Sequence, residues 1–296
     1  MNRLALIVLI VIGLTILERY SIVKPIILKL FFKGDFYMII DDTVIQDYLK
    51  DRPLEGLKNH WVFHKIEPEK YLFETPDSQK KESVSRVYQQ LLHTLNDFTP
   101  LNEHLFKRLF PNYRALLKEL NVLFIVGCPE PYDAMFLEHH DKQYIVFDLI
   151  RFSTYIEHGY DVQKLVKGLV THEFIHFCIA KDYPMPNPIT YEEQLSYIIF
   201  NEGFAHLLAF KECIEEVDWH SLEYNQYYIN AKNKLMMALK EEDPKKQSIL
   251  LEQADSGAYW DKFGAMTGKL YLSKHLGDLG AIYQKGYKDM LNAILA

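Results

Sequence analysis

Cysteine is scarce in this sequence, and its scarcity excludes two kinds of stabilising site. The chain of 296 residues has three cysteines, Cys128, Cys178 and Cys213. Three dispersed thiols form neither a disulfide framework nor the closely spaced ligand set of a thiolate zinc site. Cys178 and Cys213 lie in apolar stretches with helical character, where a free thiol packs as a small hydrophobic side chain.

Positive charge is also in short supply. Lysine and arginine total 33 against 40 aspartate and glutamate residues, which gives a formal net charge of -7. The sequence contains no basic stripe with interleaved aromatic residues, so we expect no nucleic-acid partner. Internal repeats and low-complexity segments are absent as well, and 49% of the residues are apolar against 25% charged. This composition is typical of a globular protein, with room for one large domain or two small ones.

One long apolar run stands at the N-terminus. Residues 4–17 carry no charge and follow Arg3, as in a signal peptide or a short membrane anchor. The run is shorter than the ~20 residues of most spanning helices, and no A-x-A-like cleavage site follows it. We favour an uncleaved membrane anchor and assign residues 1–33 to a signal-anchor and membrane-proximal segment. The alternative is an apolar helix docked on the folded domain.

Residues 34–104 have few clear patterns and are expected to form a poorly defined, mostly helical region. The consecutive residues Trp61, Val62 and Phe63 predict a short strand. Apolar residues at helical spacing predict an amphipathic helix over residues 83–98.

Residues 105–296 combine a small sheet with many helices. Short apolar runs bounded by turn residues predict three strands, at 121–127, 134–137 and 143–147. The last two are expected to form a hairpin. Beyond Gly159 the chain is predicted to be helical to its end. Thr190, with Glu193 three residues later, is typical of a capping box and starts a helix that we expect to reach Glu215. The expected fold class is α+β.

The most informative motif is H-E-x-x-H, at His172-Glu173-Phe174-Ile175-His176 within an apolar run. Residues four apart lie on the same face of a helix, so the imidazoles of His172 and His176 can bind one metal ion. Glu173 then lies beside that face, where it can act as the base for a metal-bound water. The alternative is a buried helix with two hydrogen-bonded core histidines and an incidental glutamate.

A zinc ion held by two histidines needs a third protein ligand, and Glu202 is the best candidate. Its neighbours at helical spacing are apolar, so its carboxylate would be costly to bury without a partner such as a metal ion. Gly203 and Ala205 are small and allow this helix to approach another closely. His172, His176 and Glu202 would leave the fourth position of zinc open, as in catalytic sites. A glutamate that meets solvent at a helix edge is the alternative.

These residues resemble a known group of enzymes. H-E-x-x-H followed by a helix-borne glutamate is similar to the gluzincin metallopeptidases. Segments 170–176 and 199–206, and the glycine-spaced segment 263–271, resemble more narrowly the bacterial YjaZ-like family of predicted zinc-dependent proteases. The resemblance implies a zincin-like metallopeptidase domain at 105–296, with a small, mostly antiparallel sheet packed on the active-site helix and a helical C-terminal half. It also implies that residues 143–147 form an edge strand to which an extended peptide can add.

The chain departs from the pattern of these enzymes at one position. They often have a carboxylate four residues after the ligand glutamate, where it orients a zinc-bound histidine, but this chain has His206 there. We expect His206 either to face the site, as an oxyanion donor or a competing ligand, or to pack in the core. Tyr271, in the glycine-spaced segment, is the tyrosine expected to stabilise the oxyanion. Further candidates for that role are Tyr224, Tyr227, Tyr228 and Tyr259.

The resemblance thus implies a peptidase that uses Zn2+ and acts on a peptide or protein substrate, with Glu173 as general base. An anchor at residues 4–17 would hold it in the membrane on the extracytoplasmic face of a bacterial cell envelope; otherwise it is exported. Two other functions stay open. One is a catalytically silent zincin-fold binding protein, and the other is a zinc hydrolase of non-peptide amides or esters.

Overall fold

The computed structural model describes residues 38–53, 55–67, 69–140, 142–185 and 189–296. The chain divides into two units, Met1–Asp35 and Phe36–Ala296, and only the second is described below. The expected anchor at residues 4–17 therefore lies outside the described residues. Within the described ranges, no helix has the length and apolar character needed to cross a membrane. From residue 36 onward, the expected region 34–104 belongs to the same unit as residues 105–296.

A four-stranded sheet lies in the N-terminal half of this unit. Its strands, in the spatial order β1-β2-β4-β3, are β1 (Ile39–Asp41), β2 (Asn121–Ile125), β4 (Lys142–Asp148) and β3 (Ala134–His139). β1 pairs with β2 and β2 with β4 in parallel, and only β3 and β4 run antiparallel. The α+β class and the strands expected after residue 120 are confirmed, but the mostly antiparallel sheet is wrong. A helical crossover separates β1 from β2, and the one hairpin joins β3 to β4, so only that pair is antiparallel.

The sheet order also corrects the expected edge strand. Residues 143–147 lie inside β4, which is hydrogen-bonded to β2 on one side and to β3 on the other. The edges of the sheet are β1 and β3. Of the two hairpin strands, β4 is the one that pairs with β2, so β4 lies inside the sheet and β3 lies at its edge.

Helices account for most of the remaining chain, and η marks a 3-10 helix. Before α9 they are α3 (Thr43–Leu49), α4 (Glu55–Lys58), η2 (Trp61–His64), η3 (Ser78–Lys80), α5 (Lys81–Asn96), α6 (Glu103–Leu109), α7 (Tyr113–Leu116), η4 (Leu117–Glu119) and α8 (Leu149–Glu157). From α9 onward they are α9 (Val162–Asp182), α10 (Tyr191–Leu208), η5 (Ile214–Glu216), α11 (Leu222–Ala238), α12 (Pro244–Asp255), α13 (Phe263–Ser273), η6 (Leu276–Asp278), α14 (Leu279–Lys285) and α15 (Tyr287–Leu295).

The strand expected at Trp61–Phe63 is wrong, because these residues form η2. Val62 and Phe63 are both fully buried, whereas consecutive residues of a strand point to opposite faces. A single tight turn instead sends both side chains into the core, and the His60 ring accepts a hydrogen bond from the Val62 backbone N–H at its start. The helix expected over residues 83–98 is confirmed as α5.

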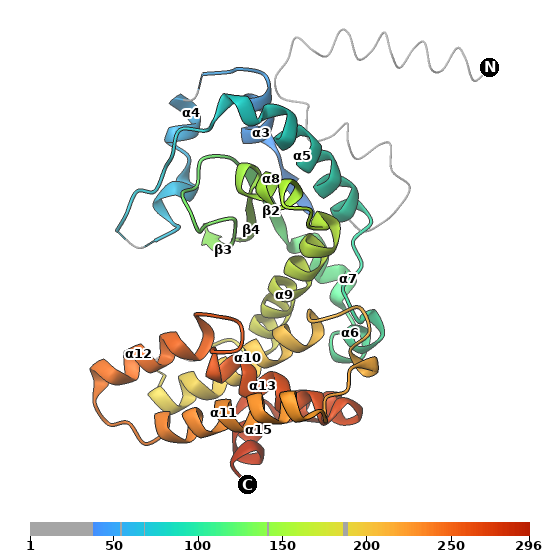
Figure 1. The fold of residues 1–296 in the computed structure, drawn as a ribbon, viewed down its shortest axis with the longest axis vertical. Helices are drawn as coiled ribbons and strands as arrows, with labels where there is room; N and C mark the ends of the chain where they lie inside the picture. Colours follow the sequence, from blue (N-terminus) through green and yellow to red (C-terminus); the bar gives the residue numbers. More distant parts are fainter. Residues whose placement is uncertain (1–37, 54, 68, 141, 186–188) are drawn as a thin grey trace, which may run out of the picture. The chain divides into compact units, whose positions relative to one another are not determined.

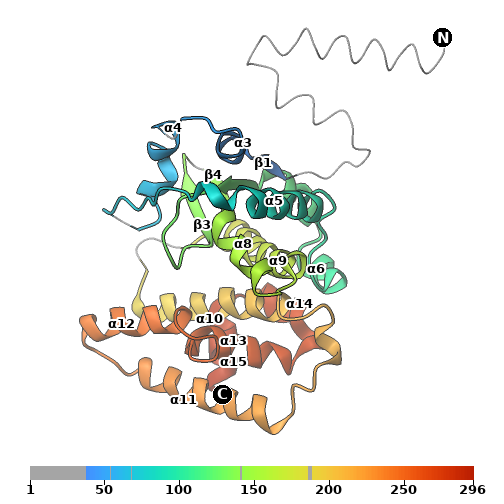
Figure 2. The same ribbon diagram turned by 45° about the horizontal axis from the view of Figure 1, so that its top comes forward.

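α9 connects the sheet to the C-terminal helices. Figures 1 and 2 show α3, α5 and α8 gathered around the sheet, with α10 to α15 packed together beyond α9. Asp161 starts α9, because its side chain accepts a hydrogen bond from the Lys164 backbone N–H. The expected capping box of Thr190 and Glu193 is present at the start of α10.

α10 ends at Leu208, seven residues before the expected end at Glu215. A residue far away in sequence determines this end. The Asn102 side chain donates to the backbone carbonyls of Leu208 and Lys211, and its oxygen accepts from the Ile214 N–H. Periodicity within the helix carries no information about such a distant cap, so the sequence overestimated its length.

α10 and α13 approach each other so closely that glycine is required at the crossing. A Cβ atom at Gly268 would lie 1.9 Å from the Ile199 backbone oxygen, and one at Gly203 would lie 2.8 Å from the Gly268 backbone. The expected close approach at Gly203 is therefore confirmed, and its partner is the glycine-spaced segment, which forms α13. This contact determines the position of the α10 turn that carries Glu202.

Replacing Gly268 with alanine tests this contact. We expect Gly268→Ala to lower the free energy of unfolding by at least about 3 kcal/mol, because the backbone of α10 must move to admit the methyl group. Urea denaturation measures the effect. The matched control is Gly280→Ala in α14, where an added Cβ meets nothing within 4 Å. Alanine should be neutral or slightly stabilising there, and equal effects at both positions would contradict the close contact.

Candidate metal centre

Two turns of α9 present His172 and His176 on one face. Their Nε2 atoms lie 3.0 Å apart, and their side chains are 18% and 14% exposed. The spacing of four residues produces this arrangement, as the H-E-x-x-H pattern predicted. The two imidazoles therefore converge on one point in a largely buried environment.

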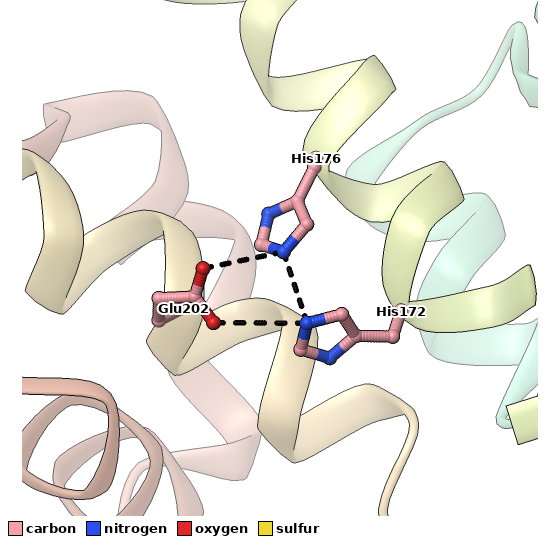
Figure 3. Close-up of side chains that lie close together, drawn as sticks. All are labelled: His172, His176 and Glu202. Carbon is pink, nitrogen blue, oxygen red and sulfur yellow. Dashed lines mark hydrogen bonds and ion pairs between the residues drawn. The ribbon is translucent and has the colours of Figure 1, made fainter. Parts of the chain in front are cut away.

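Glu202 meets this point from α10. Its Oε1 lies 3.3 Å from His176 Nε2 and its Oε2 lies 3.6 Å from His172 Nε2. Figure 3 shows the carboxylate facing both imidazoles. One ligand atom from each of the three residues lies within 4.8 Å of the others. The three expected metal ligands are therefore brought together, and the group can hold a metal ion.

Each imidazole makes one further hydrogen bond. The Nδ1–H of His176 donates to Oδ1 of Asn201, at 2.9 Å, so in the neutral ring Nε2 keeps the lone pair that a metal ion needs. The His172 ring makes a hydrogen bond with the backbone of Ala205, which raises its pKa as a carbonyl acceptor does. Two imidazole Nε2 atoms 3.0 Å apart beside a carboxylate share either a proton or a metal ion, because two bare lone pairs this close would repel each other. The donor set itself therefore fits a bound cation.

Burial and mutual charge shift the pKa values of these groups. Burial and the neighbouring His176 and His206 hold the pKa of His172 well below its usual range. Burial raises the pKa of Glu202. For His176, burial lowers the pKa, but the Glu202 and Glu173 carboxylates outweigh it and raise the pKa. Burial and close charges thus shift the pKa values of all three ligand residues, as they do in many functional sites.

Glu173 lies next to the ligand group without belonging to it. The ligand set found among the described residues consists of His172, His176 and Glu202. Burial raises the pKa of Glu173, the negative charge of Glu202 raises it further, and His176 opposes both. A carboxyl group with a raised pKa suits a general base that must also return the proton.

His206 faces the centre. Its Nε2 lies 3.4 Å from Glu202 Oε2, and its ring centroid is 4.7 Å from that of His172. Burial, with Lys262 and Lys269 nearby, lowers its pKa to about 3, so the ring is neutral. Its Nε2 is buried and makes no hydrogen bond to any described residue. No carboxylate stands at position 206 to orient His172, but the His172 ring makes a hydrogen bond with the Ala205 backbone.

Tyr271 is not brought to the centre by any contact of the described residues. Its ring packs on His275, with centroids 4.5 Å apart, and its charge acts on Tyr228. Tyr259, one of the other tyrosines considered, packs edge-on against His206 with a centroid distance of 5.3 Å. Tyr259 is therefore the better candidate for a tyrosine that borders the site.

A fully buried lysine, Lys269, is hydrogen-bonded to Tyr259. Lys269 has no exposed surface, and its Nζ donates to the Tyr259 hydroxyl at 2.7 Å. Nζ lies 3.3 Å from the Phe210 ring centroid, and three more aromatic rings surround it, those of Trp219, Tyr259 and Trp260. Burial, aided by Lys211, lowers the Lys269 pKa to about 6.

Sequence reasoning missed Asn201, Lys262 and Lys269. Asn201 directly precedes Glu202, and this position next to a proposed ligand could have indicated a role at the centre. Lys269 is the single charged residue in the apolar segment 263–272, which marks it as unusual. Lys262 is the N-cap residue that precedes α13, and its position near the centre follows only from the tertiary packing.

Replacing Lys269 with methionine tests its burial as a neutral amine. Between its ordinary pKa of 10.5 and the folded value of about 6, the unfolded chain binds a proton that the folded chain does not. Wild-type stability therefore falls as the pH decreases through this range. We expect Lys269→Met to raise the free energy of unfolding by about 1–4 kcal/mol at pH 7, and by less at pH 10. Urea denaturation at both pH values measures this difference.

The control for that experiment is Lys285→Met, at an exposed position of α14. It should change stability little at either pH. A gain in Lys269→Met that is the same at pH 7 and pH 10, or a loss at both, would contradict the assignment.

Comparisons with family models, curated proteins and solved structures find no match to this chain. The interpretation of the centre therefore depends on its own residues and distances. Those establish a group of two histidines and a glutamate that can hold a metal ion.

Proposed function

We propose that this chain is a zinc-dependent peptidase of the gluzincin type, with a zincin-like fold and a relationship to the YjaZ-like family. The observation that carries the proposal is the convergence of the Nε2 atoms of His172 and His176, 3.0 Å apart, on the carboxylate of Glu202. Two imidazole nitrogens and a carboxylate oxygen form the ligand set of many catalytic zinc sites, which leave one position open.

The chemistry divides between the ion and the side chains of the chain. Zinc bound here supplies a Lewis acid that polarises a carbonyl group and lowers the pKa of a water molecule. Glu173 takes a proton from the attacking water and later delivers it to the leaving amine. His206, neutral and with an unpartnered Nε2, donates a hydrogen bond to the substrate carbonyl oxygen as negative charge develops there. Tyr259 packs on this imidazole and restricts its orientation.

An extended peptide would pair with β3, since this strand is an edge of the sheet. Most side chains of β3 are partly exposed, which leaves room for substrate contacts along it. This proposal replaces residues 143–147, which the sheet encloses.

The experiment compares zinc content and peptide cleavage in the full chain. We expect wild type to hold about one zinc per chain and to cleave members of a peptide library. Glu173→Gln should keep the zinc and lower kcat by about 10²–10⁴-fold, because only the base is lost. Glu202→Ala should lose most of the zinc. Glu192→Gln, an exposed glutamate on α10, is the matched control and should behave as wild type.

The other two functions predict different results. A silent binding protein would hold zinc and cleave nothing, with the same partner binding in wild type and Glu173→Gln. A hydrolase of non-peptide bonds would cleave simple esters or amides and leave the peptide library intact. A wild-type protein without zinc would contradict the proposal altogether.

A further inference from the structure

Lys262 lies at the border of the centre because of how α13 packs on α10. It is the residue immediately before α13, which begins at Phe263. Two residues later, a Cβ added at Gly264 would lie 3.2 Å from Cγ2 of Ile198. Ile198 is four residues before Glu202 and therefore on the same face of α10. The first turn of α13 thus lies over the α10 turn that precedes the ligand glutamate.

The positive charge of Lys262 reaches four groups of the centre. It acts electrostatically on His172, Glu173, Glu202 and His206. The carboxylate of Asp255 also lies near and acts on two of the ligands, His176 and Glu202. Glu173 marks the side from which a substrate is attacked, and there the cation from outside the motif is Lys262.

The ammonium group of Lys262 forms no ion pair with any carboxylate of the described residues, in contrast to Lys288, which pairs with Glu193 at 2.6 Å. The side chain is partly exposed. The other lysine near the centre, Lys269, is fully buried and engaged with Tyr259. Lys262 is therefore the accessible cation that an incoming group can meet.

A divalent cation bound at the centre would offset the charges of Glu173 and Glu202. Two further charges act on the centre, the carboxylate of Asp255, which accepts a hydrogen bond from the Ser256 hydroxyl, and the ammonium group of Lys262, and of the two only Lys262 acts on Glu173. We propose that Lys262 is a specificity-determining residue that binds a carboxylate of the substrate, so that the chain prefers peptides with an acidic side chain or a free C-terminal carboxylate beside the scissile bond. This inference rests on the proposed peptidase function.

A competing explanation is that Lys262 only neutralises the buried carboxylates of the centre. In that case its removal would alter metal binding and would treat charged and uncharged substrates alike. The two explanations predict different affinities for a pair of metal-binding ligands, of which one ends in a carboxylate and the other in an uncharged group.

The experiment uses the full chain loaded with cobalt, whose visible spectrum reports ligands at the metal without any need for turnover. The probes are the monohydroxamates of succinic, glutaric and adipic acid, each matched with its uncharged terminal amide. We expect at least one acid to bind wild type roughly tenfold or more tightly than its amide, as one charged hydrogen bond provides. Lys262→Met should abolish the difference, Lys262→Arg should keep most of it, and Lys285→Met should leave it unchanged.

The outcomes distinguish this inference from the proposed function. Equal binding of all acids and amides to wild type, with a clear cobalt spectrum, overturns the role of Lys262 alone. The same conclusion follows if Lys262→Met keeps the preference for the acid. A chain that binds neither cobalt nor any hydroxamate overturns the metal centre, and both proposals fail together.

Discussion

The close contact of α10 and α13 at Gly203 and Gly268 is the constraint on which the centre depends. Both helices lack a Cβ atom at the crossing, so the backbone of one packs directly on the other. α10 carries Asn201, Glu202 and His206 within little more than one turn, and its position determines where all three meet α9. The residues that do the chemistry are therefore held by helix packing rather than by a loop.

This packing removes polar and charged side chains from water, and the cost of their desolvation must be offset by an interaction within the centre. Two adjoining imidazoles, the largely buried carboxylate of Glu202 and a second carboxylate at Glu173 would each be better solvated in water. A divalent cation removes most of this cost in one step. Lys269 adds another buried polar group nearby, so the part of the chain around Tyr259 also sacrifices stability for its arrangement.

The sequence predicted the parts of the centre that depend on local spacing. His172 and His176 share a face because of helical periodicity, and Glu202 stood out as a carboxylate on an apolar helix. The N-cap residues Asp161 and Thr190 predicted where α9 and α10 begin, because capping also depends on local sequence. What failed was non-local: the sheet order depends on which strands pair, and the end of α10 depends on Asn102, more than a hundred residues away. The roles of Ala205 and Tyr259 also follow from tertiary packing, which no pattern of spacing contains.

We propose that His172, His176 and Glu202 hold one zinc ion through two nitrogens and one oxygen. X-ray absorption at the zinc edge, on the full chain loaded with one equivalent, tests it most directly. The account predicts a first shell of nitrogen and oxygen at about 2.0–2.1 Å, with the scattering signature of two imidazoles and no sulfur. In Glu202→Ala the two-imidazole signature should persist in whatever zinc remains. A shell with sulfur at about 2.3 Å, or one with a single imidazole, would contradict the account.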